Sequence, residues 1–275
     1  ISEEYFMEDL SFLSNLKLRL SYGSLGNQSV GYYPYIATMP LNAPYTHIEL
    51  TPAYLMGGEN HPYISSSGLV SPSLTWETVN TKNIGLDFGL FQNTFSGTFD
   101  IYQRATKDML MRSSYPEILG TSAPFENAAD LVTKGWELTL TFNKRVDKDL
   151  FYSASLVLSD WKSEITKYDN PSNSLTTYYV GQQLGEIWGY ETHGIFQTED
   201  EVENAPIQST IGANWRPGDI RYKDLNDDGS INPGRNTLDD PGDRKIIGNT
   251  NPRYSFGLNF DVTYKALSLN CFFQG

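Results

Sequence analysis

The feature that most constrains this sequence is a strict alternation of apolar and polar residues over long segments. Near the end of the chain, alternate positions hold Tyr254, Phe256, Leu258, Phe260, Val262 and Tyr264, and the positions between them hold Ser255, Gly257, Asn259, Asp261 and Thr263. A period of two with one apolar face is typical of β-strands. The pattern predicts strands at residues 16–22, 83–90, 95–102, 136–142, 152–158, 254–264 and 267–273.

Composition agrees with an all-β protein and argues against several other classes. Aromatic residues make up 13% of the 275 residues, with 18 Tyr and 14 Phe, and such residues favour strands. The net charge of −13 argues against nucleic acid as a partner, because nucleic acid is itself an anion. The single cysteine, Cys271, allows neither an internal disulfide nor a thiolate zinc cluster. We interpret it as a small core or lipid-facing residue.

Alternating strands fit two architectures. In a soluble sandwich or barrel the apolar face is a core, whereas in a membrane barrel it meets lipid and the polar face lines a wet lumen. Two features favour the membrane barrel. The positions that alternate with the apolar ones hold polar or very small residues, and aromatic residues stand at the strand ends. The first group is Lys17, Arg19, Gly85, Asp87, Gly89, Asp100, Glu137, Asn259 and Asp261, and the second is Tyr22, Phe91, Tyr102, Trp136, Trp161, Tyr254 and Tyr264.

The connections between the predicted strands also favour the membrane. Short turns are predicted at 92–94, 144–149 and 265–266, and long connections at 23–80, 103–134 and 160–253. Outer-membrane barrels have short periplasmic turns and long extracellular loops, whereas compact soluble domains rarely carry several long loops. The predicted fold is therefore all-β, an antiparallel transmembrane outer-membrane β-barrel with long extracellular loops.

Several segments resemble the SusC/RagA-like TonB-dependent transporters of Bacteroidota outer membranes, and they follow one another in that family's order. LKLRLSYGSLGNQ (residues 16–28) is similar to a strand and its loop, and LTWETVNTKNIGLDFGLFQNTFSGTFDIYQRATKDML (74–110) is similar to the family's most recognisable hairpin. The others are KGWELTLTFNKRV (134–146), SLVLSDWKSEITKYDN (155–170), VGQQLGEIWGYETHGIFQTEDEV (180–202), PGDIRYKDLNDDGSIN (217–232) and DRKIIGNTNPRYSFGLNFDVTYKALSLNCFFQG (243–275).

The resemblance implies that residues 1–275 are a partial TonB-dependent receptor β-barrel. Plugged barrels of this kind have about 22 strands, and the sequence shows only about eight alternating segments. We therefore expect a central-to-late portion of the barrel, without the plug domain, the TonB-binding segment or the barrel ends.

The resemblance also implies a function in the cell outer membrane, surrounded by its lipid. It implies an importer of oligosaccharides or peptides that is not an enzyme. Its partners would be a SusD-like surface lipoprotein and, through the missing plug region, the TonB complex. The alternative function is a calcium-stabilised cell-surface binding or adhesion β-domain.

The stretch DLNDDGSIN (residues 224–232) begins as a calcium loop does. Positions 1, 3 and 5 carry side-chain oxygens, position 6 is glycine, position 7 can offer a carbonyl, and Ile231 at position 8 can anchor the loop. Position 12 holds Arg235 where a bidentate Glu is expected, and the family resemblance implies Asp243 as the closing residue instead. We predict a calcium-loop-like extracellular segment at 217–248, with Ca2+ held by Asp224, Asn226, Asp228, Ser230 and Asp243. The alternative is an Asx-rich turn that binds no ion.

No catalytic centre is predicted. The three histidines, His47, His61 and His193, are scattered in predicted loops, and the neighbouring acidic residues lack the burial expected of an acid and base pair. TEDEVEN (198–204) predicts one helical turn capped by Thr198. Loop aromatics could stack on sugars or peptide side chains, although most are expected to be structural and no substrate-binding residue is identified: Tyr32, Tyr33, Tyr35, Tyr45, Tyr54, Tyr63, Tyr115, Tyr178, Tyr179, Trp188 and Trp215.

Overall fold

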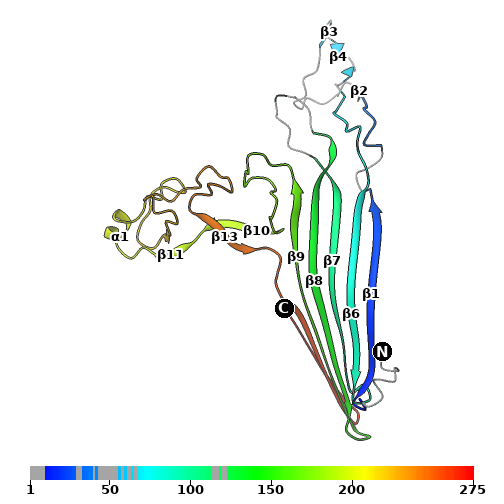
Figure 1. Cartoon of the computed structure of the whole chain (residues 1–275). Coiled ribbons are helices and arrows are strands. Elements are labelled where there is room, and N and C mark those ends of the chain that lie inside the picture. Colours follow the sequence, from blue (N-terminus) through cyan, green and yellow to red (C-terminus); the bar gives the residue numbers. More distant parts are fainter. Residues whose placement is uncertain are drawn as a thin grey trace. The chain divides into compact units, whose positions relative to one another are not determined.

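Seven long strands form one open antiparallel sheet in the computed structural model of the chain (Figure 1). The structure describes residues 10–28, 33–39, 41–42, 55–56, 59–60, 63–64, 67–112, 118 and 123–275. The strands of the sheet are β1 (Leu13–Asn27), β6 (Glu77–Leu90), β7 (Phe95–Arg112), β8 (Phe125–Arg145), β9 (Leu150–Tyr168), β14 (Ser255–Tyr264) and β15 (Leu267–Gln274). Their order is β1-β6-β7-β8-β9-β14-β15, so β1 and β15 are the edges. Every predicted strand is present.

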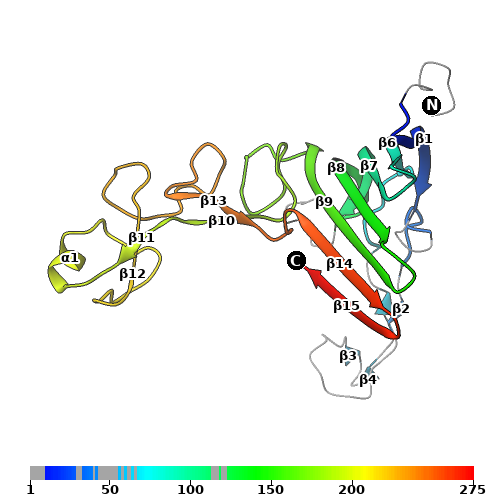
Figure 2. The same cartoon turned by 90° about the horizontal axis from the view of Figure 1, so that it is seen from below.

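The three predicted short turns are confirmed. They join β6 to β7, β8 to β9 and β14 to β15. Gln92, Asn93 and Lys265 have φ values of 56°, 61° and 54°, so the β6–β7 and β14–β15 turns use left-handed conformations without glycine. Because antiparallel hairpins return the chain to its starting end, these turns share one end of the sheet and the longer connections share the other (Figures 1 and 2).

The strands are longer than the alternation predicted. Residues 103–134 were expected to form a long connection, but β7 continues to Arg112 and β8 already begins at Phe125. A hydrophobic pattern is needed only where one face meets lipid, whereas the backbone hydrogen bonds of a sheet continue without it. Side chains also tie these extensions, since Asn127 Nδ2 donates to the carbonyl oxygens of Asp108 and Thr75 at 2.7 and 3.0 Å.

The connection from β9 to β14 has its own secondary structure. This 169–254 lobe contains β10 (Glu186–Tyr190), β11 (Thr192–Ile195), α1 (Glu199–Glu203), β12 (Ile220–Tyr222) and β13 (Arg244–Asn249). Strand β10 pairs with β13, and β11 with β12. The Thr198 side chain accepts a hydrogen bond from Glu201 N at the start of α1, as predicted. No helix among the described residues is long and apolar enough to cross a membrane.

The chain divides into two compact units. The first comprises Ile1–Ser24, Asn80–Ala105 and Asp130–Gly275, and the second comprises Leu25–Val79 and Thr106–Ala129. The second contains the two-residue strands β2 (Leu41–Asn42), β3 (Leu55–Met56), β4 (Glu59–Asn60) and β5 (Tyr63–Ile64). Within it, the Glu77 carboxylate accepts hydrogen bonds from Asn27 Nδ2 and Leu110 N, both at 2.9 Å.

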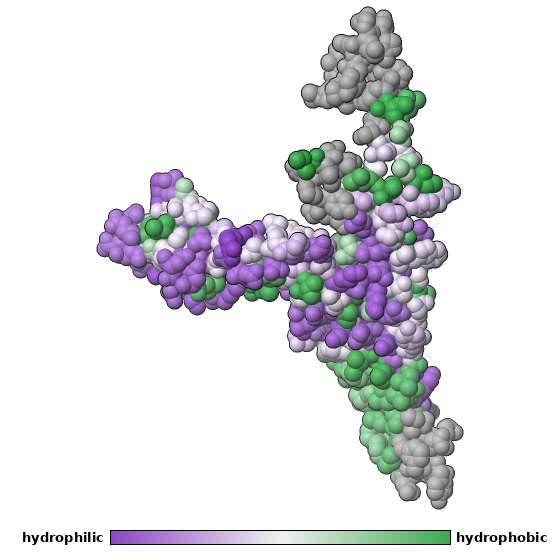
Figure 3. All heavy atoms as spheres, turned by 45° about the horizontal axis from the view of Figure 1, so that its top comes forward, coloured by the Kyte–Doolittle hydropathy of each residue, from purple (hydrophilic) through white to green (hydrophobic). Residues whose placement is uncertain are grey.

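One face of the sheet is apolar and exposed. Strand β14 sets its apolar residues opposite those of β9, with Leu258 against Leu156 and Val262 against Tyr152. Large apolar side chains along this face remain exposed, at 37% for Leu258, 57% for Ile84 and 59% for Leu269. Figure 3 shows hydrophobic residues gathered near the short-turn end of the strands. A soluble protein rarely leaves so continuous an apolar surface uncovered, so the face is suited to lipid.

Candidate functional site

An ion-paired cluster joins β1, β6 and β7 on the polar face of the sheet. Arg19 Nε donates to the two carboxylate oxygens of Asp87 at 2.9 and 3.0 Å. Arg19 Nη2 donates to Asp100 Oδ2 at 2.7 Å, and Asn83 Nδ2 donates to Asp100 Oδ1 at 2.9 Å. The alternation predicted that Arg19, Asp87 and Asp100 share one face, and the structure brings them together.

Gly85 gives this cluster its space. A Cβ atom at Gly85 would lie 2.5 Å from Asp100 Oδ1 and 2.7 Å from Arg19 Cζ, so any larger residue would push the ion pairs apart. Side-chain exposure is 36% for Arg19, 23% for Asp87 and 17% for Asp100. Because water reaches all three groups, their attraction is screened and contributes little net stability. The cluster therefore acts mainly by fixing charges in place along the face.

A second polar cluster lies on the same kind of face where β9, β14 and β15 meet. Asn259 Nδ2 donates to Asp261 Oδ2 at 2.8 Å, and Asn270 Nδ2 donates to Asn259 Oδ1 at 3.0 Å. Ser153 Oγ donates to Asp261 Oδ2 at 3.4 Å. The opposite face of these strands carries Leu258 and Phe260. Each strand thus presents amides and carboxylates to one side and apolar groups to the other.

The predicted calcium loop has the backbone that its sequence requires. Gly229 and Asp227 take left-handed φ values of 81° and 58°. The loop is closed by its own side chains, since Asp224 Oδ2 accepts from Gly229 N at 2.7 Å and Asp228 Oδ1 accepts from Ser230 N at 2.8 Å. Asn226 Oδ1 accepts from Asp228 N at 3.1 Å. Asp224, Asn226 and Asp228 are therefore gathered in one turn.

Asp224 has one oxygen that the loop does not satisfy. Its Oδ1 atom is buried and has no hydrogen-bond partner among the described residues. Burial alone raises the pKa of Asp224, but the backbone N–H groups led by Gly229 outweigh it and lower the pKa below its usual value. The carboxylate is thus held ionised with one oxygen unused, which is the state in which it can bind a hard cation.

Asp243 closes the loop through the backbone. It is fully buried, at 0% exposure, and its two oxygens accept from Leu225 N at 2.8 Å and Asn232 N at 2.9 Å. Ile231 is also at 0% exposure, as predicted for position 8, and its N–H donates to the Ile207 carbonyl at 2.7 Å. Asp243 therefore joins both ends of the predicted loop by hydrogen bonds, and its predicted role as a calcium ligand stays a prediction.

The carboxylates alone do not form a cage. Among the described residues, no group of three or more His, Cys, Asp or Glu side chains has the spacing to hold a metal ion. The predicted site relies on the Asn226 amide and the Ser230 carbonyl beside two or three carboxylates, and calcium accepts such neutral oxygens. The residues present fit a weak calcium site, and calcium binding stays a prediction.

Three of the loop aromatics, Tyr179, Trp188 and Trp215, are held by hydrogen bonds within the lobe. Tyr179 is 6% exposed; its hydroxyl donates to Glu186 Oε2 at 2.5 Å and accepts from Trp188 Nε1 at 3.2 Å. Trp215 Nε1 donates to the Gln208 and Gly212 carbonyls, both at 3.1 Å. Tyr33, Tyr35 and Tyr178 are exposed. His193 is exposed on β11, whereas His47, His61, Tyr32, Tyr45, Tyr54, Tyr115 and the Tyr63 side chain lie outside the described residues.

The fold and its two opposed faces are matched by a known family. The model of the family described as "TonB dependent receptor-like, beta-barrel" matches residues 9–272. The chain belongs to this family. TonB-dependent receptor barrels lie in the outer membrane, so the predicted location and fold class are confirmed.

Individual relatives cover the whole chain. TonB-dependent receptor P3 of Formosa agariphila is 27% identical over 287 residues, which cover 100% of this chain and 27% of that protein. TonB-dependent receptor SusC of Bacteroides thetaiotaomicron is 27% identical over 271 residues, covering 96% of this chain and 25% of SusC. The predicted resemblance to SusC-like receptors is confirmed. The chain spans roughly a quarter of the length of these relatives.

A solved structure shows the same fold. The structure of the RagAB peptide transporter matches with a TM-score of 0.69 at 24% identity, covering 98% of this chain and 27% of that one. A second structure, of the RagAB peptide importer in the "closed-closed" state, matches with a TM-score of 0.69 at 22% identity and covers 100% of this chain. At this identity the likeness concerns the fold.

Proposed function

We propose that this chain forms part of the wall of a TonB-dependent outer-membrane importer of oligosaccharides or peptides. The observation that carries the proposal is the separation of the two faces on the same strands. Arg19, Asp87 and Asp100 fix charges on one face, while Ile84 stands exposed and Leu86 half-buried on the other. The polar face lines a hydrated path for a solute, and the apolar face seals the wall in lipid.

The proposed partners follow from the same family. A SusD-like surface lipoprotein would cover the long connections, and the TonB complex would supply energy through a plug domain in the full-length protein. The similarity to SusC supports such a lipoprotein, and the matched RagAB structure is that of a peptide transporter. The orientation that suits these partners places the 169–254 lobe outside the cell and the short turns in the periplasm.

Lipid exposure tests the proposal strand by strand. Spin labels at Ile84 and Leu86 of the intact protein in lipid vesicles are expected to be accessible to oxygen, because these side chains face the acyl chains. Labels at Thr98 and Thr139, on the polar face, are expected to be accessible to a water-soluble relaxation agent. Electron paramagnetic resonance measures both.

The opposite result has a definite meaning. If Ile84 and Leu86 were inaccessible to both agents, they would be packed in a protein core. The membrane wall would then be wrong, and the alternative of a calcium-stabilised cell-surface binding or adhesion domain would be favoured. Labels at Asp87 or Gly89 are avoided because both positions have close side-chain neighbours.

We also propose that the 217–248 segment binds calcium through Asp224, Asn226, Asp228 and the Ser230 carbonyl, with Asp243 holding the loop closed. The buried, unpaired Asp224 Oδ1 supports this proposal. The binding chemistry is oxygen coordination at about 2.3–2.6 Å with weak affinity suited to an extracellular module. An ion would order a connection that has only a small apolar core of its own.

Calcium should slow amide hydrogen exchange in residues 218–247 of the intact protein. The Asp228→Ala variant is expected to lose this protection without any change in the long strands, because one ligand is removed. Asp239→Ala is the matched control, since Asp239 lies in the same segment outside the proposed ligand set. Equal calcium protection in the Asp228→Ala variant, or none in the unaltered protein, would contradict calcium binding.

A further inference from the structure

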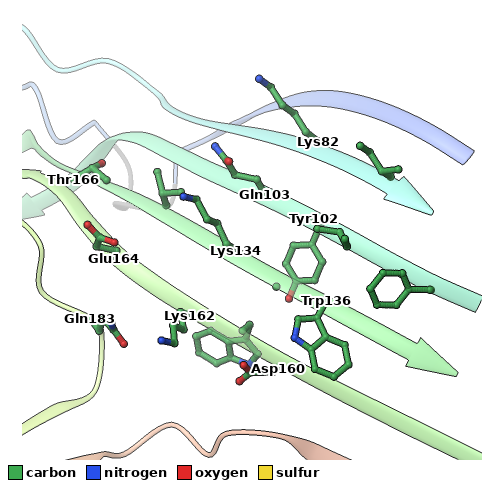
Figure 4. Close-up of a pocket in the computed structure, with 16 residues that line it drawn as sticks. Lys82, Tyr102, Gln103, Lys134, Trp136, Asp160, Lys162, Glu164, Thr166 and Gln183 are labelled. Atoms are coloured by element: carbon green, nitrogen blue, oxygen red, sulfur yellow. The ribbon is translucent and has the colours of Figure 1, made fainter. Parts of the chain in front are cut away.

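A hollow on the outer, apolar face of β6 to β9 combines an apolar floor with a basic rim. Its volume is ≈ 740 Å³, and its floor includes Ile84, Ile101 and Trp136. The Trp136 ring contacts Phe99 with ring centroids 6.3 Å apart. The rim carries Lys82 from β6, Lys134 from β8 and Lys162 from β9 (Figure 4).

The three lysines follow directly from the alternation of their strands. Lys82 lies two residues from Ile84 on β6, and Lys134 lies two residues from Trp136 on β8. Residues two apart on a strand share a face. The lysines are therefore on the lipid-facing side of the wall, at the point where its apolar residues end.

Lys134 and Lys162 lie across from one another on β8 and β9. The hydroxyl groups of their neighbours Thr133 and Ser163 are 2.6 Å apart on the polar face, so the two strands are in register at this point. Like charges directly opposite each other on adjacent strands are destabilising. An anion between these ammonium groups would remove the repulsion.

The protein itself does not supply that anion. Among the described residues, no carboxylate lies within 4.0 Å of Lys82, Lys134 or Lys162, and all three are exposed. Two carboxylates line the hollow, Asp160 and Glu164. Asp160 is held by an ion pair with Arg253, and Glu164, whose β-bridge with Gln183 involves only the backbone, forms no ion pair with these three lysines. The basic rim thus remains open in a chain whose net charge is −13.

The position of the rim along the strands matches the surface of a membrane. A tilted strand crosses the hydrocarbon core in about ten residues. Counting about ten residues along each strand from its short turn leads to Lys82 on β6 and to Trp136 on β8. Tryptophan prefers this level of a bilayer, with its ring at the headgroups. The short turns share the other end of the sheet, so the rim lies at the leaflet nearer to the long connections.

We propose that this hollow binds a phosphorylated glycolipid of the outer leaflet, with its phosphate groups between Lys82, Lys134 and Lys162 and an acyl chain over Ile84, Ile101 and Trp136. Charge complementarity selects the phosphate, and the apolar floor selects a lipid over a free anion. The lipid would hold four neighbouring strands at their membrane boundary. This inference rests on the proposed membrane wall and its orientation, and it does not depend on what the protein imports.

The test uses the full-length protein in phosphatidylcholine vesicles containing diphosphoryl lipid A. The triple variant Lys82→Gln, Lys134→Gln, Lys162→Gln removes the charges and keeps similar side-chain length. Each lysine near an anionic surface is worth about a fivefold change in affinity, so the triple variant should bind lipid A on the order of a hundredfold more weakly. Retained lipid, counted by native mass spectrometry after extraction, should fall accordingly.

Matched controls make the result specific. Lys144→Gln, Lys148→Gln, Lys265→Gln changes the net charge equally at the short-turn end and should keep lipid A binding, as should Lys→Arg at the three rim positions. If the Gln triple variant failed to insert, Lys134→Gln alone should show about a fivefold loss. Three outcomes would overturn the proposal: unchanged binding in the rim variant, equal binding of dephosphorylated lipid A, or displacement of lipid A by inorganic phosphate.

Discussion

Replacing Leu86 by arginine in the intact receptor is expected to lower the free energy of unfolding from the membrane by about 2–4 kcal/mol, because Leu86 lies on the lipid-facing side of β6 near the middle of the bilayer. The short turn at 91–94 marks one membrane boundary, and about ten residues cross the core. Urea titration of the protein folded into lipid vesicles measures the change.

Two controls vary the depth of the new charge in the bilayer and the face of the sheet that carries it. Phe88 shares the face of Leu86 but lies nearer the turn, so Phe88→Arg should cost less, about 0–1 kcal/mol if its charge reaches the interface. Thr98→Arg places the same charge on the polar face of β7 and should leave stability nearly unchanged. A Leu86→Arg cost no larger than that of Thr98→Arg would contradict the assignment of lipid to the apolar face.

Removing residues 192–222 and joining Glu191 to Lys223 through a Gly-Ser linker should abolish growth on the imported nutrient. The join is short because Lys223 N donates to the Glu191 carbonyl at 2.9 Å. The deletion removes β11, α1 and β12 and leaves the seven-stranded sheet intact. The barrel should therefore still insert, while the surface proposed to meet the lipoprotein is lost. Growth measures uptake of the nutrient, a pull-down measures binding of the lipoprotein, and cell-surface labelling measures insertion of the barrel.

The deletion also removes Ile207, whose backbone pairs with Gly229 and Ile231. Asp228→Ala loosens that neighbouring loop without removing the lobe and should retain growth. It therefore separates the effect of losing the lobe surface from the effect of disturbing the loop. Unchanged uptake and lipoprotein binding in the deletion variant would contradict the proposed role of the lobe. Protease cleavage at 265–266 from outside intact cells would contradict its orientation.

Much of the site could be predicted because alternation is a local property. Arg19, Asp87 and Asp100 were assigned to one face from sequence alone, and the structure joins them by hydrogen bonds. The extents of the strands could not be predicted in the same way. Beyond residue 103 the faces of β7 no longer differ in polarity, and only the pairing with β8 shows that the strand continues to Arg112.

The sequence by itself determined the class of fold, the seven strands, the two faces and the short turns, since a period of two assigns every side chain to a side without reference to distant residues. Only the tertiary structure decided what depends on register between strands or on packing between distant segments. Asp243 reaches Leu225 N and Asn232 N because the intervening chain folds back. Lys134 faces Lys162 because β8 and β9 are paired at that point, and no local pattern in the sequence encodes the register of that pairing.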